Sequence, residues 1–169
     1  MPKTVELLTA GYEGEDLEMF VAKLQAAGVE RVIDVRFTPL SRKRGFSKTP
    51  LSERLKQAGI EYVHYKELGT LKSIREAYKE TKDFAAFRKA YDAYLNDQAK
   101  PMAMVYQLAA TKRSVMLCYE ADYHFCHRKV LADRLEKDFH GEHTLEIVHL
   151  PPASMAAVKP TKPAKAAKA

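Results

Sequence analysis

Residues 32–35 of the chain, Val32-Ile33-Asp34-Val35, form a run in which only the aspartate is polar. Such a short apolar run is typical of a parallel strand that is buried on both faces of its sheet. It is preceded by a run at 5–9 whose residues are typical of a strand, and by apolar residues that recur at helical spacing between 17 and 24. The chain therefore begins by alternating strand, helix and strand.

The same alternation continues as far as residue 150. Further strands are expected at 62–65, 115–119 and 145–150, and further helices at 84–95, 101–110 and 126–139. A short helix is expected to open at Thr49-Pro50, with a capping hydroxyl and a proline in the first helical position, and to end at Gly59. The segment from Gly69 to Phe84 is expected to be a connection. The pattern predicts an α/β fold, a three-layer α/β/α arrangement around a mostly parallel sheet of about five strands.

The chain is expected to be one domain with a tail. Residues 1–150 are predicted to be a single α/β domain, and residues 151–169, rich in Lys, Pro and Ala, are predicted to be disordered. The net charge is +6, but four lysines beyond residue 150 supply four of those charges, so the domain itself is nearly balanced. Two cysteines, no membrane-length apolar run and no secretory signal predict a cytoplasmic protein without a membrane.

Polar residues follow several of the predicted strands. Because parallel strands bring their carboxyl ends to one edge, where ligands bind, we expect these residues to form one site. The candidates are Tyr12, Asp34, Arg36, Ser41, Lys48, Tyr65, Cys118, Glu120, Cys126, His127 and Arg128.

Asp34 and Arg36 face the same way on a strand and have two interpretations. They are either a structural ion pair, or a pocket in which Arg36 binds an anion and Asp34 orients it or acts as a base. The basic loop Arg42-Lys43-Arg44 would then steer a polyanion toward the pocket. The glycines of the turn at 11–14 also permit a phosphate-binding turn before a helix.

The segment from Cys118 to Arg128 is the densest in reactive side chains. Cys126 and His127 fall in the first turn of a predicted helix, where the helix dipole lowers a thiol pKa and favours anions. The cysteines are interpreted as reactive thiols with His127 or Glu120 as base, as metal ligands together with a histidine, or as packing residues beside an anion site. We expect no metal, because the seven-residue gap between the cysteines differs from the usual zinc-ligand spacing, and no cofactor motif is found.

Taken together, these residues resemble the domain of unknown function 488 family. The resemblance spans nearly the whole predicted domain and excludes the tail. In one departure, Thr70 follows Leu68-Gly69, where the family often has a second glycine. The resemblance implies that both cysteines and the Cys-His-Arg triplet are characteristic of the family and share a site with Asp34 and Arg36, but it implies no reaction. Its segments are Gly11-Tyr12-Glu13-Gly14, Asp34-Val35-Arg36 with Pro39 and Ser41, Gly45-Phe46-Ser47-Lys48, Leu68-Gly69, Leu117-Cys118-Tyr119-Glu120 and Cys126-His127-Arg128.

The leading interpretation is a cytoplasmic enzyme that acts on a phosphate-bearing small molecule or a nucleic acid. Arg36, Arg128 and the helix after residue 125 would hold the anion. Cys118 would be the nucleophile, and Glu120 and His127 would transfer protons. The alternatives are a non-catalytic nucleic-acid-binding module that uses the basic loop and the tail, and a thiol-based redox-responsive binding protein. The oligomeric state is not predicted.

Overall fold

The computed structural model describes residues 2–153, and within them one five-stranded sheet forms the centre of the fold. All its paired strands are parallel, in the order β3-β2-β4-β1-β5. The strands are β1 (Lys3–Gly11), β2 (Arg31–Asp34), β3 (Glu61–His64), β4 (Ser114–Cys118) and β5 (His143–His149). The predicted three-layer α/β/α fold with a parallel sheet is confirmed.

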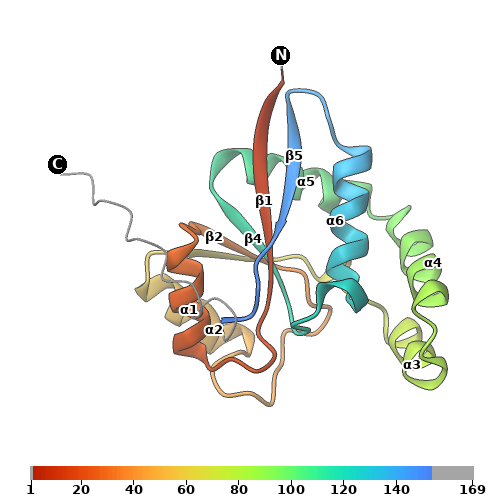
Figure 1. The fold of residues 1–169 in the computed structure, drawn as a ribbon, viewed down its shortest axis with the longest axis horizontal. Helices are drawn as coiled ribbons and strands as arrows, with labels where there is room; N and C mark the ends of the chain where they lie inside the picture. Colours follow the sequence, from red (N-terminus) through yellow and green to blue (C-terminus); the bar gives the residue numbers. More distant parts are fainter. Residues whose placement is uncertain (1, 154–169) are drawn as a thin grey trace.

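Helices cover both faces of the sheet. The helices in residues 2–153 are α1 (Leu17–Ala26), α2 (Lys48–Gln57), α3 (Lys72–Thr81), α4 (Phe84–Leu95), α5 (Ala99–Thr111) and α6 (His127–Asp138), with short 3-10 turns η1 (Lys66–Leu68) and η2 (Tyr123–Phe125). Figure 1 shows α1 and α2 on one side of the sheet and α4 and α6 on the other. α3 and α4 form an outer pair beyond α6 (Figure 1).

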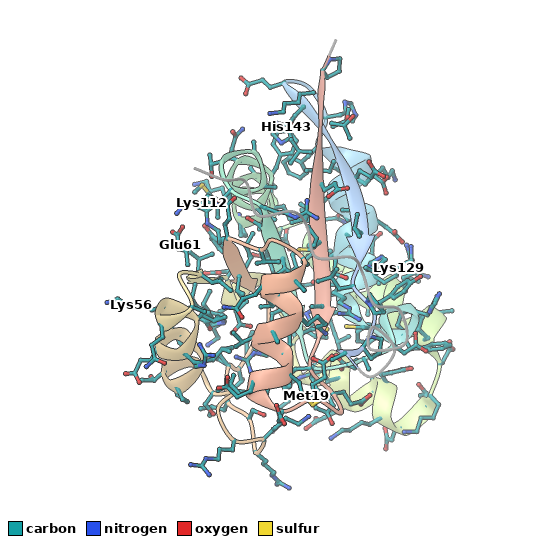
Figure 2. All side chains as sticks on the ribbon, turned by 60° about the vertical axis from the view of Figure 1, so that its left-hand side comes forward. Met19, Lys56, Glu61, Lys112, Lys129 and His143 are labelled. Atoms are coloured by element: carbon teal, nitrogen blue, oxygen red, sulfur yellow. The ribbon has the colours of Figure 1, made fainter. Side chains whose placement is uncertain are left out.

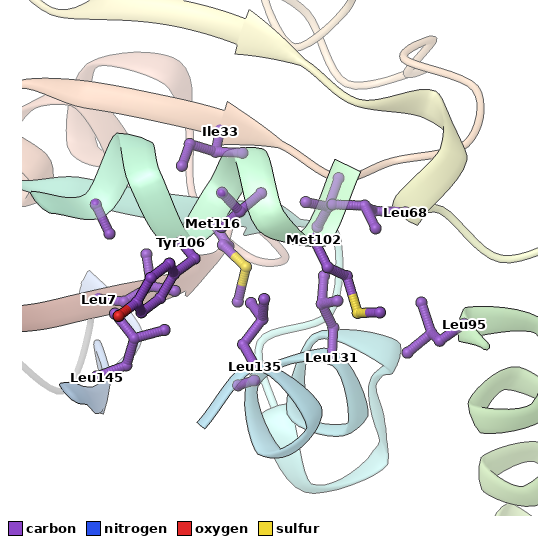
Figure 3. Packing of buried hydrophobic residues seen from close by; sticks show 14 of the residues in the cluster. Leu7, Ile33, Leu68, Leu95, Met102, Tyr106, Met116, Leu131, Leu135 and Leu145 are labelled. Carbon is purple, nitrogen blue, oxygen red and sulfur yellow. The ribbon is translucent and has the colours of Figure 1, made fainter. Parts of the chain in front are cut away.

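The alternation of side chains along the strands divides the core in two. Leu7, Ile33 and Met116 pack with α4, α5 and α6, whereas their neighbours Leu8 and Val32 pack with α1 and α2. Figure 3 shows the first of these clusters, in which Met116 of β4 lies near residues of α5 and α6. Each large apolar side chain buried in this way contributes about 1.5–3 kcal/mol of transfer free energy.

The starts of two helices, and the presence of a third helix, differ from the sequence prediction. α2 begins at Lys48 after the N-cap Ser47, so Pro50 is the third helical residue and not the first. α5 begins at Ala99, which makes Pro101 the third residue there as well. Proline is accepted at these positions because N–H groups of the first turn have no partner within the helix. α3 was expected to be part of a connection and is a helix.

Ion pairs occupy the edge of the sheet opposite the predicted site. Glu61, at the start of β3, binds Arg31 at 3.1 Å and Lys112 at 3.1 Å. Figure 2 shows Glu61 and Lys112 close together at this edge. Pairs of this kind at the surface each contribute little to stability, so this edge is interpreted as structural.

Residues 151–153, at the start of the predicted tail, are described, and the backbone N–H of Ala153 donates a hydrogen bond to Glu15 at 2.6 Å. The rest of the predicted tail lies outside the described residues, and its disorder stays a prediction. In the described part of the chain, no helix combines the length and the apolar character that a membrane crossing requires.

Candidate functional site

The carboxyl ends of three strands meet at one place in the sheet. Gly11 at the end of β1 pairs with Cys118 at the end of β4, and Asp34 at the end of β2 pairs with Leu117. A Cβ atom on Gly11 would lie 1.8 Å from the backbone oxygen of Glu120. Only glycine therefore allows the chain that leaves β4 to cross the end of β1, and this crossing fixes the position of Glu120.

The glycine turn after β1 uses two of its backbone N–H groups within the protein. The backbone N–H groups of Tyr12 and Glu13 both donate to the carbonyl oxygen of Tyr119, at 3.1 and 2.8 Å. These hydrogen bonds join the turn after β1 to the turn after β4. These two donors are therefore engaged within the protein, which gives no support to a phosphate-binding role for this turn.

Asp34 and Arg36 form a buried ion pair. The Arg36 guanidinium donates from Nε to Asp34 Oδ1 at 2.9 Å and from Nη2 to Oδ2 at 2.7 Å. Its Nη1 donates to the hydroxyl of Tyr12 at 3.2 Å and to the carbonyl oxygen of Phe46 at 2.6 Å. Tyr62 donates its hydroxyl to Asp34 at 2.5 Å. Burial acts to lower the pKa of Arg36, but the hydrogen bonds and charge of Asp34 outweigh it and raise that pKa. This geometry favours the interpretation of Asp34 and Arg36 as a structural ion pair, because most of the Arg36 donors bind groups inside the protein.

The two cysteines form a compact cluster with an acid and a histidine. Cys118 Sγ lies 2.8 Å from Cys126 Sγ, and both are free and buried. Glu120 Oε2 lies 3.3 Å from Cys126 Sγ, and His127 Nδ1 lies 3.9 Å from it. Cys126 is the N-cap of α6, and its sulfur accepts the backbone N–H of Arg128 at 3.4 Å. The 3-10 turn η2 folds the chain back so that Cys126 returns to the end of β4.

The electrostatics of this cluster differ from the sequence prediction. Burial raises the pKa of Cys126 well above its ordinary value, Cys118 and Glu120 raise it further, and the charge of Arg128 opposes them. The predicted lowering of this thiol pKa by the helix N-terminus is therefore outweighed by burial. Burial also lowers the pKa of His127, so that its imidazole is neutral at neutral pH.

His127 has a defined tautomer. Its Nε2 lies 3.0 Å from the carbonyl oxygen of Val35, which can only accept, so Nε2 carries the proton. The unprotonated Nδ1 then has a lone pair on the side of the thiols.

Arg128 is entirely buried and is turned away from solvent. Its Nη2 donates to the carbonyl oxygen of Ala121 at 3.0 Å. Its Nε and Nη1 are buried and have no hydrogen-bond partner among the described residues. A buried guanidinium with two nitrogens of this kind is unusual, because an unpaired buried polar group is costly.

A pocket of about 770 Å³ opens beside the cluster, and Glu120 and His127 form part of its wall. Four further cationic residues line it, namely Arg42, Lys43, Arg75 and Lys79, in addition to Arg36. Six aromatic residues line it as well, namely Tyr12, Phe37, Tyr78, Phe87, Tyr119 and Phe125. The pocket therefore combines positive charge with aromatic surface.

The family described as "Domain of unknown function DUF488" matches residues 16–135. The chain belongs to the DUF488 family. The match includes the Asp34–Arg36 pair and the segment from Cys118 to Arg128, and it confirms the resemblance seen in the sequence. Among curated proteins and solved structures, no match was found. The description of the family assigns no activity.

The predicted site residues of this DUF488 protein separate into three groups. Those that line the pocket are Tyr12, Arg36, Ser41, Glu120 and His127. Those that are buried and outside its lining are Asp34, Cys118, Cys126 and Arg128. Lys48 and Tyr65 also lie outside the lining, and the Tyr65 ring packs against the α4–α6 side of the core.

Several residues of the pocket were not found by sequence reasoning. Arg75, Tyr78 and Lys79 come from α3, where the spacing of three and four places them on one helix face. Phe37 directly follows Arg36, and Phe125 lies within the segment from Cys118 to Arg128. The available signal was the position of Phe125 directly before Cys126 in the sequence, and the structure shows that its side chain is 58% exposed.

Proposed function

We propose that this DUF488 protein is an enzyme that acts on a phosphate-bearing small molecule containing an aromatic ring, of which a nucleotide is the simplest example. The proposal depends on one observation, the pocket of about 770 Å³ whose wall combines cationic and aromatic side chains. Pockets for small molecules and cofactors commonly have volumes of about 300–1,000 Å³. The size of the pocket therefore suits a mononucleotide better than a nucleic-acid duplex.

The phosphate would meet Arg42, Arg75 and Lys79. Among the described residues, none of these three side chains has an ion-pair or hydrogen-bond partner. By contrast, Arg36 is engaged by Asp34, and Lys43 donates to two backbone carbonyl groups. This assignment moves the anion-binding role from Arg36 and Arg128, where the sequence prediction put it, to residues that have donors to offer.

The aromatic ring of the ligand would stack on the exposed aromatic residues of the wall. Phe125 is 58% exposed and Tyr119 is 46% exposed, which leaves large apolar faces in contact with water. Stacking of a base on an aromatic side chain is worth about 1–3 kcal/mol. Phe125 lies against Phe84 of α4 at 5.6 Å between ring centroids, so its ring is partly held in place.

Glu120 is the proposed proton-transfer group, because its carboxylate lines the pocket beside the neutral imidazole of His127. Direct attack by Cys118, which the sequence favoured, gains no support from the geometry. Its side chain is completely buried and lies outside the pocket lining. We therefore propose acid–base chemistry at Glu120 in place of a thiol nucleophile.

Binding is tested by calorimetric titration of the full-length protein with adenosine monophosphate, adenosine and inorganic phosphate. The nucleotide should bind more tightly than either of its halves. The double variant Arg75→Gln/Lys79→Gln should raise the Kd for the nucleotide by tenfold or more, as expected when about 1.4 kcal/mol or more of phosphate contact is lost. Lys72→Gln on the same helix is the matched control, because Lys72 is exposed and outside the pocket lining. Equal Kd values for all three proteins would contradict the proposal.

Catalysis is tested with the same protein in an activity screen against phosphate esters and nucleotides. Glu120→Gln should abolish turnover and keep binding, whereas Phe125→Leu should weaken binding of the nucleoside more than that of phosphate. Single-stranded DNA is included to test the alternative of a nucleic-acid module, which would show a steep salt dependence of affinity.

A cytoplasmic location is also proposed, with support from two cysteines that are free in the structure.

A further inference from the structure

We propose that Cys118, Glu120, Cys126 and His127 form a binding site for a divalent metal ion, and that the ion is zinc. Each of these residues offers one ligand atom, and the four atoms lie within 4.8 Å of one another. This inference goes beyond the proposed function, because it concerns the cluster beside the pocket and not the ligand in the pocket. It also bears on Glu120, which belongs to both. A carboxylate bound to zinc cannot transfer protons, so zinc should inhibit the turnover proposed for Glu120, and the activity screen is carried out on metal-free protein.

The donor set decides between metals. Two thiolates, one imidazole and one carboxylate are ligand types that zinc accepts, and zinc binds four ligands in a tetrahedron. Magnesium and calcium prefer oxygen ligands, so the two sulfur atoms exclude them. The sulfur atoms are 2.8 Å apart in the structure. Tetrahedral zinc with bonds of about 2.3 Å needs roughly 3.7 Å between them, so the two side chains would separate by about 1 Å.

The surroundings of His127 are those of a metal ligand. A histidine that binds a metal through one nitrogen usually donates the other N–H to a carbonyl or carboxylate group. Here Nε2 donates to the carbonyl oxygen of Val35 at 3.0 Å, which leaves Nδ1 to bind the ion.

The charge of the site is balanced by Arg128. Two thiolates, the Glu120 carboxylate and Zn²⁺ together carry one negative charge. The guanidinium of Arg128 carries one positive charge, is entirely buried, and has two nitrogens without a partner among the described residues. Its backbone N–H donates to Cys126 Sγ at 3.4 Å, so Arg128 lies beside the cluster. A zinc-loaded site would thus give this buried cation an opposite charge, which is the condition under which a buried charge is tolerated.

The sequence argument against a metal considered only the spacing of the cysteines. The structure supplies the two further donors from the same segment, because Glu120 follows β4 and His127 opens α6. The fold back through η2 brings all four together, and no distant histidine is needed. Binding replaces the thiol protons, so that one Zn²⁺ and two thiols give the zinc dithiolate and two protons released to solvent.

Metal content is the first test. The full-length protein is expressed in zinc-supplemented medium and purified under reducing conditions without chelator. Its zinc content is then measured by inductively coupled plasma mass spectrometry. About one zinc per chain is expected, and Cys118→Ser and Cys126→Ser should lose it. His124→Ala is the matched control, because His124 lies in the same segment but is exposed and outside the cluster. Zinc that is absent from the wild type, or retained equally in both cysteine variants, would overturn the proposal.

The second test keeps the proposal falsifiable if the serine variants do not fold. Wild-type protein is freed of metal with a chelator, reduced, and titrated with Co²⁺. A thiolate-to-cobalt charge-transfer band that saturates at one equivalent, and that Zn²⁺ abolishes, supports the site. Absence of this band from folded, reduced protein would overturn it. Thiol counting in denaturant on the protein as purified must give two free thiols, because a Cys118–Cys126 disulfide there would indicate a redox pair instead of a resident metal. None of these measurements requires the pocket ligand, so failure here leaves the proposed function untouched.

Discussion

Replacing Arg36 by methionine is expected to lower the free energy of unfolding by about 3–5 kcal/mol, the usual cost of removing one partner of a buried ion pair. Asp34 is completely buried and would lose both guanidinium hydrogen bonds, at 2.9 and 2.7 Å. It would keep only the hydroxyl of Tyr62 and the backbone N–H of residue 36. These two donors do not neutralise a carboxylate, so most of the desolvation cost would remain.

This loss is large compared with the total stability of a domain, which is typically about 5–15 kcal/mol. For a chain of this size, 1 kcal/mol corresponds to about 2–4 °C in melting temperature, so Arg36→Met should melt about 6–20 °C below the wild type. The measurement is urea denaturation followed by circular dichroism at neutral pH. Arg54→Met is the control, because Arg54 binds Glu18 with two similar hydrogen bonds on the surface and its loss should hardly change the midpoint.

The double variant Asp34→Asn/Arg36→Met separates the charge from the packing. Neutralising the orphaned carboxylate should recover part of the loss, so the double variant should be more stable than Arg36→Met alone. If Arg36→Met has the stability of the wild type, or if the double variant is less stable than the single one, Arg36 does not stabilise the fold by neutralising a buried Asp34 carboxylate.

The fold could be predicted because its central strands, β2 and β4, are buried on both faces. β2 and β4 appear in the sequence as short apolar runs. The helices that connect the strands appear as apolar residues that recur at helical spacing. α3 was missed, although Ile74, Ala77 and Tyr78 recur at helical spacing, because most of its residues are polar and none is buried. Its Tyr78 packs on the Phe84 and Phe87 rings of α4 at 5.9 and 5.1 Å. Contacts with α4 therefore determine its place against the rest of the domain.

The site could be predicted only as a location. The rule that parallel strands end at one edge correctly brought the cysteine segment beside Arg36. It could not say which polar side chains face the pocket and which face the interior. Asp34 and Arg128 are of residue types that often bind ligands, yet both side chains are completely buried. The cationic residues of α3 reach the pocket from a segment that the sequence presented only as a connection.

Three further substitutions test other parts of the structure. Gly11→Ala should destabilise the protein and weaken ligand binding, because the added Cβ would lie 1.8 Å from the backbone oxygen of Glu120. Thermal denaturation and ligand titration measure the two effects. A melting temperature equal to that of the wild type would contradict the close crossing of the two chain segments. Tyr62→Phe removes a hydrogen bond to the Asp34 carboxylate and should cost about 1.5–3 kcal/mol in urea denaturation, whereas an unchanged midpoint would mean that water replaces it. His149→Gln should reduce the loss of stability on acidification. Burial first, and then the charges of Arg128 and Lys129, lower the pKa of His149 to about 4 from its ordinary value of 6.5. Between these two pH values the unfolded chain binds the proton more readily than the folded protein, so stability present above pH 6.5 is lost as the pH falls toward 4. After allowance for the partial exposure of this side chain, the loss is of order 1–2 kcal/mol. Urea denaturation at neutral pH and near pH 4 compares the two proteins. The variant should keep part of the dependence, because burial also lowers the pKa of His127, and an equal loss in both proteins would show that His149 does not contribute.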